Sequence, residues 1–219
     1  MKRIIKNILI FLSYFIYSIL IKGLLFLVNI NYYSMSTNNK ILITFLIELS
    51  YIILLIILYR KELIKDLKDF RENYKKYISN YIIIYLLGII LMSVTNIILS
   101  KITNQDLSSN EIIVRDYIQK FPLYMIFSSV IYAPFVEEII FRKSIKNIIK
   151  NKYIFIILSG LIFGLLHISK LNINEILYSI PYIIMGIDFA YIYYKTDNIF
   201  TTMTFHLCHN LVLLIFQLI

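Results

Sequence analysis

The sequence is poor in charged residues, and this shortage argues against a soluble protein. Only 16% of its 219 residues are charged, whereas a soluble domain of this size uses about a quarter to cover its surface. The hydrophobic residues, 59% of the chain, come in blocks long enough to match a bilayer's hydrocarbon core. Because a segment in lipid must satisfy its own backbone hydrogen bonds, these blocks are predicted to be transmembrane helices.

Three other features are scarce or missing, and each narrows the interpretation. Cys208 is the single cysteine, which excludes an internal disulfide. No Ala-x-Ala cleavage site follows the basic start at residues 1–6, so the first apolar stretch is expected to stay as a membrane anchor. No histidine is followed by glutamate, so the HExxH signature of soluble metalloproteases is absent.

The net charge of +9 would fit a nucleic-acid partner, but the positions of the basic residues argue against one. Lysines and arginines lie between the apolar blocks, where they orient a membrane protein. With the N-terminus inside, sixteen of them fall in inner segments and five in outer loops. We therefore predict a multi-pass protein of the cell membrane with a cytoplasmic N-terminus, in contact with membrane lipids and no nucleic acid.

The apolar blocks predict an all-α fold, a polytopic transmembrane bundle of about seven helices, with a range of six to eight. The basic stretch Arg60–Lys76 carries Leu63, Leu67 and Phe70 at helical spacing, which predicts an amphipathic helix on the cytoplasmic face. No repeat or linker divides the chain, so residues 1–219 are expected to form one integral membrane domain. The predicted spans are roughly Ile8–Ile30, Ile41–Tyr59, Tyr81–Ser100, Phe121–Ile149, Tyr153–Ser169, Ile176–Tyr194 and Ile199–Ile219.

Several strongly polar residues lie inside these apolar blocks, and they are candidates for function. An ionisable group in the membrane costs roughly 3 kcal/mol, so it persists where it pairs, lines a cavity or reacts. All three histidines of the chain lie in predicted spans and none lies in a loop. The candidates are Glu137, Glu138, His167, Asp188, His206, His209 and Asn210.

The spacing of these residues predicts how they lie on their helices. Glu138 and Arg142 are four apart, so they share a helix face and are expected to form an ion pair. Pro134 lacks a backbone N–H and is expected to kink the helix just before Glu137. Gly160 and Gly164 form a small-xxx-small pair that allows a neighbouring helix to approach closely.

The distances along the chain also predict a shared depth. Glu137 and His167 lie about equally far from the basic turn at residues 151–152, so they are expected at one level of the membrane. His206 and Asn210 share one face of the last helix, and His209 is expected to face away. Because His206 enters from the same cytoplasmic side, the site is expected to open toward the cytoplasm.

A carboxylate and an imidazole at one level can together act on water. A buried glutamate can serve as a general base. A second imidazole and an amide can donate hydrogen bonds to a developing oxyanion. The same groups could instead bind a divalent metal such as zinc, which activates water. Peptide hydrolysis fits either scheme.

Three motifs within these blocks resemble those of the CPBP intramembrane proteases, the family that includes the CAAX-processing endopeptidases. Residues Glu137–Arg142 resemble its EExxxR motif, Phe163–His167 its FxxxH motif and His206–Asn210 its HxxxN motif. The resemblance covers about residues 121–210. The family often has a Thr-Gly-Ser turn before the last helix, whereas Asp197 follows Thr196 here.

The resemblance implies a role for each matching residue. Glu137 would be the catalytic glutamate, and His167 its partner in activating water. His206 and Asn210 would form the oxyanion hole. A divalent metal, if the family chemistry uses one, would lie at Glu137, His167 and His206. The remaining motif residues Glu138, Arg142 and Phe163 would support the site.

These inferences favour an intramembrane endopeptidase that hydrolyses a peptide bond near the cytoplasmic side, acting on a peptide or membrane-protein substrate. Its expected setting is bacteriocin self-immunity or peptide and CAAX-type processing. The alternative is a non-catalytic membrane immunity protein or pseudo-protease that binds a peptide in the same cavity. A small transporter with a proton-linked carboxylate is a third hypothesis, and the absence of an inverted repeat speaks against it.

Overall fold

The computed structural model describes residues 2–218, and throughout that range the regular elements are helices without any strand. The helices are α1 (Lys2–Leu27), α2 (Thr37–Thr103), α3 (Ser109–Lys120), α4 (Pro122–Met125), α5 (Ala133–Glu137), α6 (Ile145–Ile148), α7 (Lys152–Leu165), α8 (Ile173–Thr196) and α9 (Ile199–Leu218). Five stretches are long and apolar enough to cross a membrane: α1, α2, the continuous Pro122–Ile148 helix, α8 and α9. The predicted all-α membrane bundle is confirmed.

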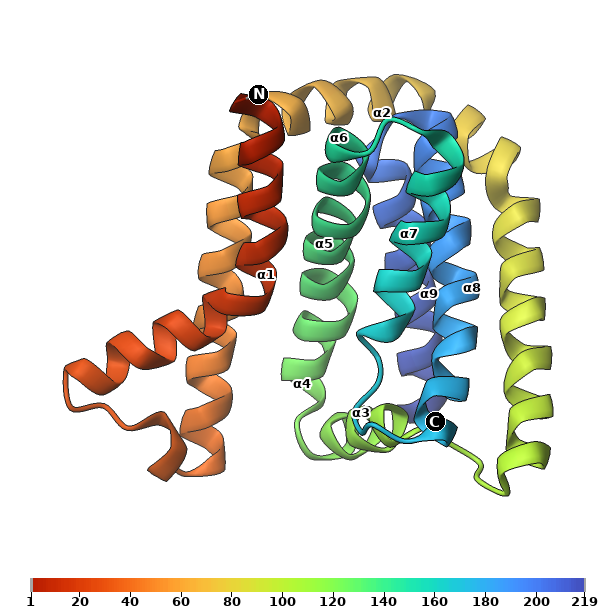
Figure 1. The fold of residues 1–219 in the computed structure, drawn as a ribbon. Helices are drawn as coiled ribbons and strands as arrows, with labels where there is room; N and C mark the ends of the chain where they lie inside the picture. The colour runs from red at the N-terminus through yellow and green to blue at the C-terminus, as the bar shows by residue number, and fades with distance from the viewer. Residues whose placement is uncertain (1, 219) are drawn as a thin grey trace.

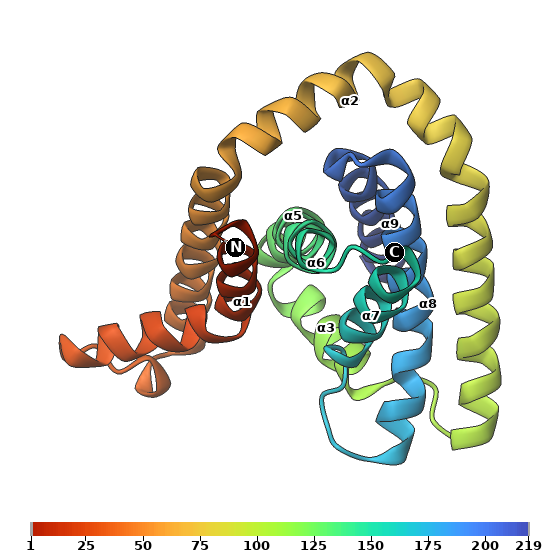
Figure 2. The same ribbon diagram turned by 45° about the horizontal axis from the view of Figure 1, so that its top comes forward.

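Helix α2 joins two predicted spans and the basic stretch between them into one helix of 67 residues. It runs along the bundle, crosses one end of it and returns along the other side (Figures 1 and 2). The crossing part is Arg60–Lys76, which is helical as predicted. Its apolar face holds it in place, because Leu63 is buried and the ring of Phe70 lies 6.4 Å from that of Phe200.

The two ends of the bundle differ in charge. The N-terminus, the crossing segment Arg60–Lys76 and the α6–α7 turn lie at one end, which we call the basic end (Figure 1). Sixteen of the lysines and arginines belong to the segments of this end. Helix α3, the α7–α8 loop and the C-terminal end of α9 lie at the opposite end, which we call the α3 end (Figure 1).

Helices α7 and α8 pack backbone against backbone, as the glycine pair predicts. A Cβ on Gly160 would lie 2.9 Å from the backbone nitrogen of Ile187, and one on Gly164 would lie 2.7 Å from that of Ile183. Only glycine leaves room for this approach. The close contact fixes α7, and with it the position of His167, relative to α8.

Near the site, the structure differs from the sequence-based prediction in the end of one helix and in the presence of another. Helix α7 ends at Leu165 and not at Ser169, so His167 lies in the turn that follows. In this turn the backbone N–H of His167 donates to the carbonyl of Gly164 at 3.1 Å. The predicted outer loop before the fourth span contains helix α3, which Ser108 caps by accepting a hydrogen bond from the N–H of Glu111 at 3.2 Å. Local capping therefore makes a helix where the low hydropathy predicted a loop.

The helix that carries the two glutamates is not a regular α-helix. Short α5 is flanked by π-helical stretches, Ile126–Tyr132 and Glu138–Ser144. Pro134 near the start of α5 cannot donate a backbone hydrogen bond, so the predicted disturbance takes the form of a change in helix type. π-Helical turns occur frequently at functional sites.

Candidate active site

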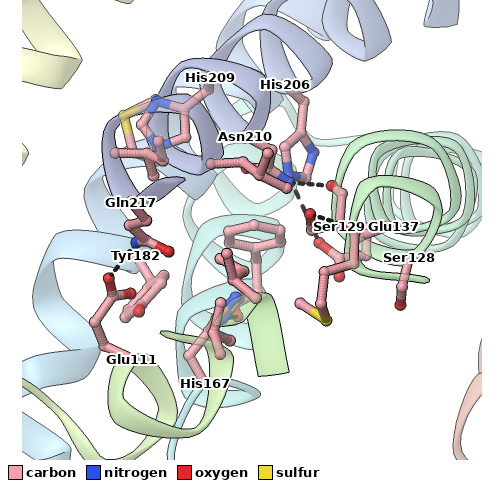
Figure 3. A pocket seen from close by; sticks show the side chains of 18 of the residues that line it. Glu111, Ser128, Ser129, Glu137, His167, Tyr182, His206, His209, Asn210 and Gln217 are labelled. Carbon is pink, nitrogen blue, oxygen red and sulfur yellow. Dashed lines mark hydrogen bonds and ion pairs between the residues drawn. The ribbon is translucent and has the colours of Figure 1, made fainter. Parts of the chain in front are cut away.

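A cavity of about 270 Å³ lies inside the bundle, and the four predicted catalytic residues all line it. Its walls come from α3, the π-helical stretch before α5, α5 itself, the end of α7, α8 and α9. Figure 3 shows side chains from these separate elements pointing toward a common space. The residues from the sequence motifs that line it are Glu137, Phe163, His167, His206 and Asn210.

Glu137 meets His206 at the wall of this cavity. A carboxylate oxygen of Glu137 lies 3.8 Å from Nε2 of His206. The other ring nitrogen, Nδ1, lies 3.0 Å from a carboxylate oxygen of Glu138. An ionised carboxylate only accepts hydrogen bonds, so Nδ1 carries the proton and Nε2 faces Glu137. The imidazole is thus held between two carboxylates, one on each nitrogen.

The predicted ion pair of Glu138 and Arg142 is present and completely buried. Nε of Arg142 lies 3.3 Å from Glu138, and neither side chain has any exposed surface. Arg142 also donates to the hydroxyl of Ser159 at 3.0 Å, which in turn donates to the carbonyl of Phe141 at 2.6 Å. This arrangement offsets the charge of Glu138 and fixes the carboxylate that orients His206.

Aromatic rings also pack against the side chains of Arg142 and His206. The guanidinium of Arg142 lies 4.7 Å from the ring centre of Phe163, a contact of the cation–π type. The ring of Phe189 stacks on His206 with centroids 5.0 Å apart. Phe163 of the FxxxH motif therefore contacts the arginine of the EExxxR motif, which accounts physically for a supporting role.

His167 lies elsewhere in the cavity and has different partners. Its Nδ1 is 2.9 Å from the carbonyl of Phe163, and its ring stacks on Tyr182 with centroids 4.0 Å apart. The family resemblance implies that His167 is the partner of Glu137, whereas the imidazole that lies 3.8 Å from Glu137 is that of His206. The order of the motifs along the chain does not specify how each helix is rotated about its axis. It therefore could not predict which histidine lies next to Glu137.

Asn210 anchors the last helix to the irregular helix. Its amide donates to the carbonyl of Ser129 at 2.7 Å, within the π-helical stretch. The amide has a second N–H, which remains for a ligand. His209, predicted to face away, also lines the cavity and lies edge-on to Tyr85, so that prediction is wrong.

The predicted metal ligands do not form a ligand set in this structure. Between residues 2 and 218, no three His, Cys, Asp or Glu side chains lie close enough together to hold a metal ion. Glu137 and His206 are neighbours, but among the described residues neither forms an ion pair or hydrogen bond with His167. The set of Glu137, His167 and His206 therefore does not fit a bound zinc ion in this conformation.

Glu48 is a neighbour of the site that no motif contains. It is buried in α2 and accepts hydrogen bonds from the hydroxyls of Tyr124 at 3.1 Å and Ser128 at 2.9 Å. Ser128 lines the cavity, so Glu48 ties α2 to the cavity wall. The sequence feature that could have identified Glu48 is the one that identified Glu137, a carboxylate inside an apolar block.

The cavity extends away from the basic end. Its walls continue to Glu111 and Ile118 of α3 and to Gln217 near the end of α9. Toward the basic end, the fully buried Glu138, Arg142 and other residues of the second π-helical stretch follow directly. The cavity therefore extends toward the α3 end, and its opening toward the cytoplasm stays a prediction.

Comparisons with known proteins identify the C-terminal part of the chain. Residues 119–212 match the family model described as type II CAAX prenyl endopeptidase, Rce1-like. The chain is 35% identical to a Bacillus subtilis (strain 168) protein named as a membrane peptidase, YdiL, over 114 residues, which are 51% of this chain and 44% of that protein.

A second relative is the membrane-embedded CAAX protease MroQ of Staphylococcus aureus (strain USA300). It is 33% identical over 156 residues, which are 66% of this chain and 60% of MroQ. The chain thus spans less than two thirds of either relative. No solved structure gives a significant match. Residues 119–212, which contain all three motifs, therefore carry the similarity to the Rce1-like CAAX prenyl endopeptidases.

Proposed function

We propose that the protein is an intramembrane endopeptidase in which Glu137 and His206 activate water for attack on a peptide bond. The observation that carries the proposal is their meeting, 3.8 Å apart, at the wall of a cavity inside a bundle of apolar helices. A carboxylate next to an imidazole can take a proton from water and pass it on. The relatives named as peptidases support the same reaction class.

The steps follow from the positions of the groups. Glu137 takes a proton from water, and the resulting hydroxide attacks the carbonyl carbon of the peptide. The second N–H of Asn210 stabilises the negative charge that develops on the carbonyl oxygen. The proton passes through Glu137 or Nε2 of His206 to the leaving amine as the carbon–nitrogen bond breaks. Nε2 of His167 remains for the substrate or the attacking water, because Nδ1 is engaged.

The substrate we propose is a peptide or a membrane-protein segment that enters this apolar cavity from the bilayer. Peptide maturation, CAAX-type processing or bacteriocin self-immunity are settings in which such a reaction occurs. The cavity has apolar walls built by Met125, Met185 and Leu214, among others, so it favours an apolar stretch of chain. We also propose that the N-terminus is cytoplasmic, on the charge distribution given above.

Replacing Glu137 by glutamine tests the proposal. Peptide cleavage by the purified full chain in liposomes, followed with a fluorogenic peptide library, should fall by roughly 10²-fold or more because the general base is lost. Glu72→Gln is the matched control, since Glu72 is exposed on the crossing segment and should leave the rate unchanged. Undiminished cleavage by Glu137→Gln would refute the assignment. Peptide binding without any cleavage by the unsubstituted protein would favour the non-catalytic immunity function.

A further inference from the structure

A second cavity, separate from the one that Glu137 lines, lies at the basic end. Its volume is about 500 Å³, and its walls come from the start of α1, the crossing segment of α2, the α6–α7 turn, α7 and the end of α8 (Figure 1). The two cavities share no lining residue. Glu137 lines the first and Lys143 the second, and the residues between them have no exposed surface. The second cavity therefore takes no part in the proposed hydrolysis.

The carboxylates that line this second cavity each have a partner within the protein. The pairs are Glu62 with Lys6, Asp66 with Lys143, Asp69 with Tyr77, and Asp197 with Lys146. The shortest of these contacts joins Asp66 to Lys143 at 2.5 Å. The negative charge of the wall is therefore already balanced by groups of the protein itself.

Three basic side chains of the wall have no such partner. Arg3, Lys65 and Lys150 are exposed, and within residues 2–218 none of them forms an ion pair with a carboxylate. Arg3 is oriented by one hydrogen bond, from Nη2 to the side-chain oxygen of Asn147 at 2.8 Å, which leaves most of its N–H groups for a ligand. The wall thus carries an excess of positive charge, brought together from α1, α2 and the α6–α7 turn.

Lys143 adds a buried positive charge to the same wall. This residue is only 5% exposed, and its ammonium group has three N–H donors. Asp66 accepts from one of them, and in the described part of the chain no acceptor contacts the other two. An anion in the cavity would therefore gain charge-assisted hydrogen bonds from Lys143, which are stronger than those between neutral groups.

We propose that this cavity binds a phosphate group, with Lys143 in the wall and Arg3, Lys65 and Lys150 around the ligand. Phosphate oxygens are strong hydrogen-bond acceptors, and the planar guanidinium of Arg3 can donate two parallel hydrogen bonds to them. The proposal concerns binding and not hydrolysis, so it is independent of the proposed endopeptidase function.

An anionic phospholipid headgroup is the source of phosphate that the surroundings favour. Basic pockets between membrane helices bind such headgroups. Lys150 is followed at the start of α7 by Tyr153 and Ile154, which are 69% and 54% exposed, so acyl chains can lie along this helix while the phosphate enters the cavity. A soluble phosphate compound offers the same group without acyl chains, and the experiment distinguishes the two sources.

Calorimetric titration tests the site with defined probes. The full chain, purified in a nonionic detergent, is titrated with short-chain phosphatidylglycerol, with short-chain phosphatidylcholine, whose headgroup has no net charge, and with inorganic phosphate. The test variant removes the three unpaired charges by combining Arg3→Gln, Lys65→Gln and Lys150→Gln. The matched control removes the same charge from exposed residues of the crossing segment that do not line the cavity, by combining Lys61→Gln, Lys68→Gln and Arg71→Gln.

We expect phosphatidylglycerol to bind several-fold more tightly than phosphatidylcholine. The test variant should lose roughly tenfold or more in affinity for phosphatidylglycerol, whereas the control should lose less than about twofold. Binding of inorganic phosphate with the same dependence on the variants would support the site and assign it to a soluble ligand. No binding of either anionic probe, or equal losses in the two variants, would overturn the proposal.

A single substitution keeps the test decisive if the triple variant does not fold. Lys150→Gln changes one exposed residue of the α6–α7 turn, and Lys68→Gln is its matched control on the crossing segment. The affinity of Lys150→Gln for phosphatidylglycerol should fall several-fold relative to that of Lys68→Gln. The same affinity in both single variants would count against the site.

Discussion

At the scale of residues, the site is a buried chain of charges in which each group orients the next. Arg142 forms an ion pair with Glu138, Glu138 accepts a hydrogen bond from Nδ1–H of His206, and Nε2 of His206 thereby faces Glu137. Of the two adjacent glutamates, only Glu137 lines the cavity. The pair Glu138–Arg142 thus contributes by positioning an imidazole rather than by touching the substrate.

Removing the arginine should destabilise the protein more than removing an exposed partner at the same spacing. Arg142→Gln leaves Glu138 as an unpaired charge in a site without exposed surface, and such losses cost about 3–5 kcal/mol. Lys120→Gln is the control, because Lys120 pairs with Asp116 at the surface, also four residues apart, and such pairs contribute less than about 1 kcal/mol. Thermal unfolding in detergent measures both, and equal shifts would contradict the argument.

At the scale of elements, two features position the site: the irregular helix before and after α5, and the backbone contact of α7 with α8. The first presents Glu137 to the cavity and Glu138 to the buried arginine. The second fixes the turn that carries His167, since Gly164 lies against Ile183. The irregular helix depends on Pro134, which lacks a backbone N–H. The α7–α8 contact depends on Gly164, which lacks a side chain.

Adding a single methyl group to the α7–α8 contact should push the two helices apart. In Gly164→Ala the new Cβ would lie 2.9 Å from Cα of Ile183, so α7 must move, at a cost of about 1–3 kcal/mol. Gly23→Ala is the matched control, because a Cβ there has no neighbour within 4 Å and alanine favours a helix. Thermal unfolding should show a loss for Gly164→Ala and none for Gly23→Ala. Cleavage should also weaken in Gly164→Ala alone.

At the scale of the whole molecule, the helices sort the basic residues to one end. Helix α2 is central to this, because it crosses the basic end (Figure 1), where Asp66 accepts from Lys143 of the second π-helical stretch and Phe70 lies near Phe200 of α9. The N-terminus lies at the basic end and the end of α9 at the α3 end (Figure 1). The two ends of the described chain therefore lie on opposite sides of the membrane.

Reporter fusions check this arrangement. Alkaline phosphatase joined after Leu218 should be active in bacteria, because the proposed cytoplasmic N-terminus places that end of α9 on the non-cytoplasmic side. A fluorescent protein joined there should stay dark. The same fluorescent protein joined before Lys2 should fluoresce. Activity of the phosphatase only at the N-terminal fusion would show that the charge argument assigns the sides the wrong way round.

The sequence by itself determined the class of the protein, its motifs and its local pairings. Long apolar blocks, the Glu138–Arg142 spacing and the Gly160–Gly164 pair each act over one helix, so periodicity is enough to predict them. The order of the helical segments and the placement of the basic residues between them can also be read directly from the sequence.

Only the tertiary structure decided which histidine meets Glu137, how α2 continues through the crossing segment, and to which end the cavity runs. These depend on the rotation and tilt of helices that lie far apart in the sequence, which no spacing within one helix encodes. Glu137 therefore pairs with His206 and not with His167. The cavity also extends to α3, which hydropathy does not predict. That helix starts at a local cap, Ser108, and the backbone N–H of Ser109 donates to Glu175 of α8, a contact between segments far apart in the sequence.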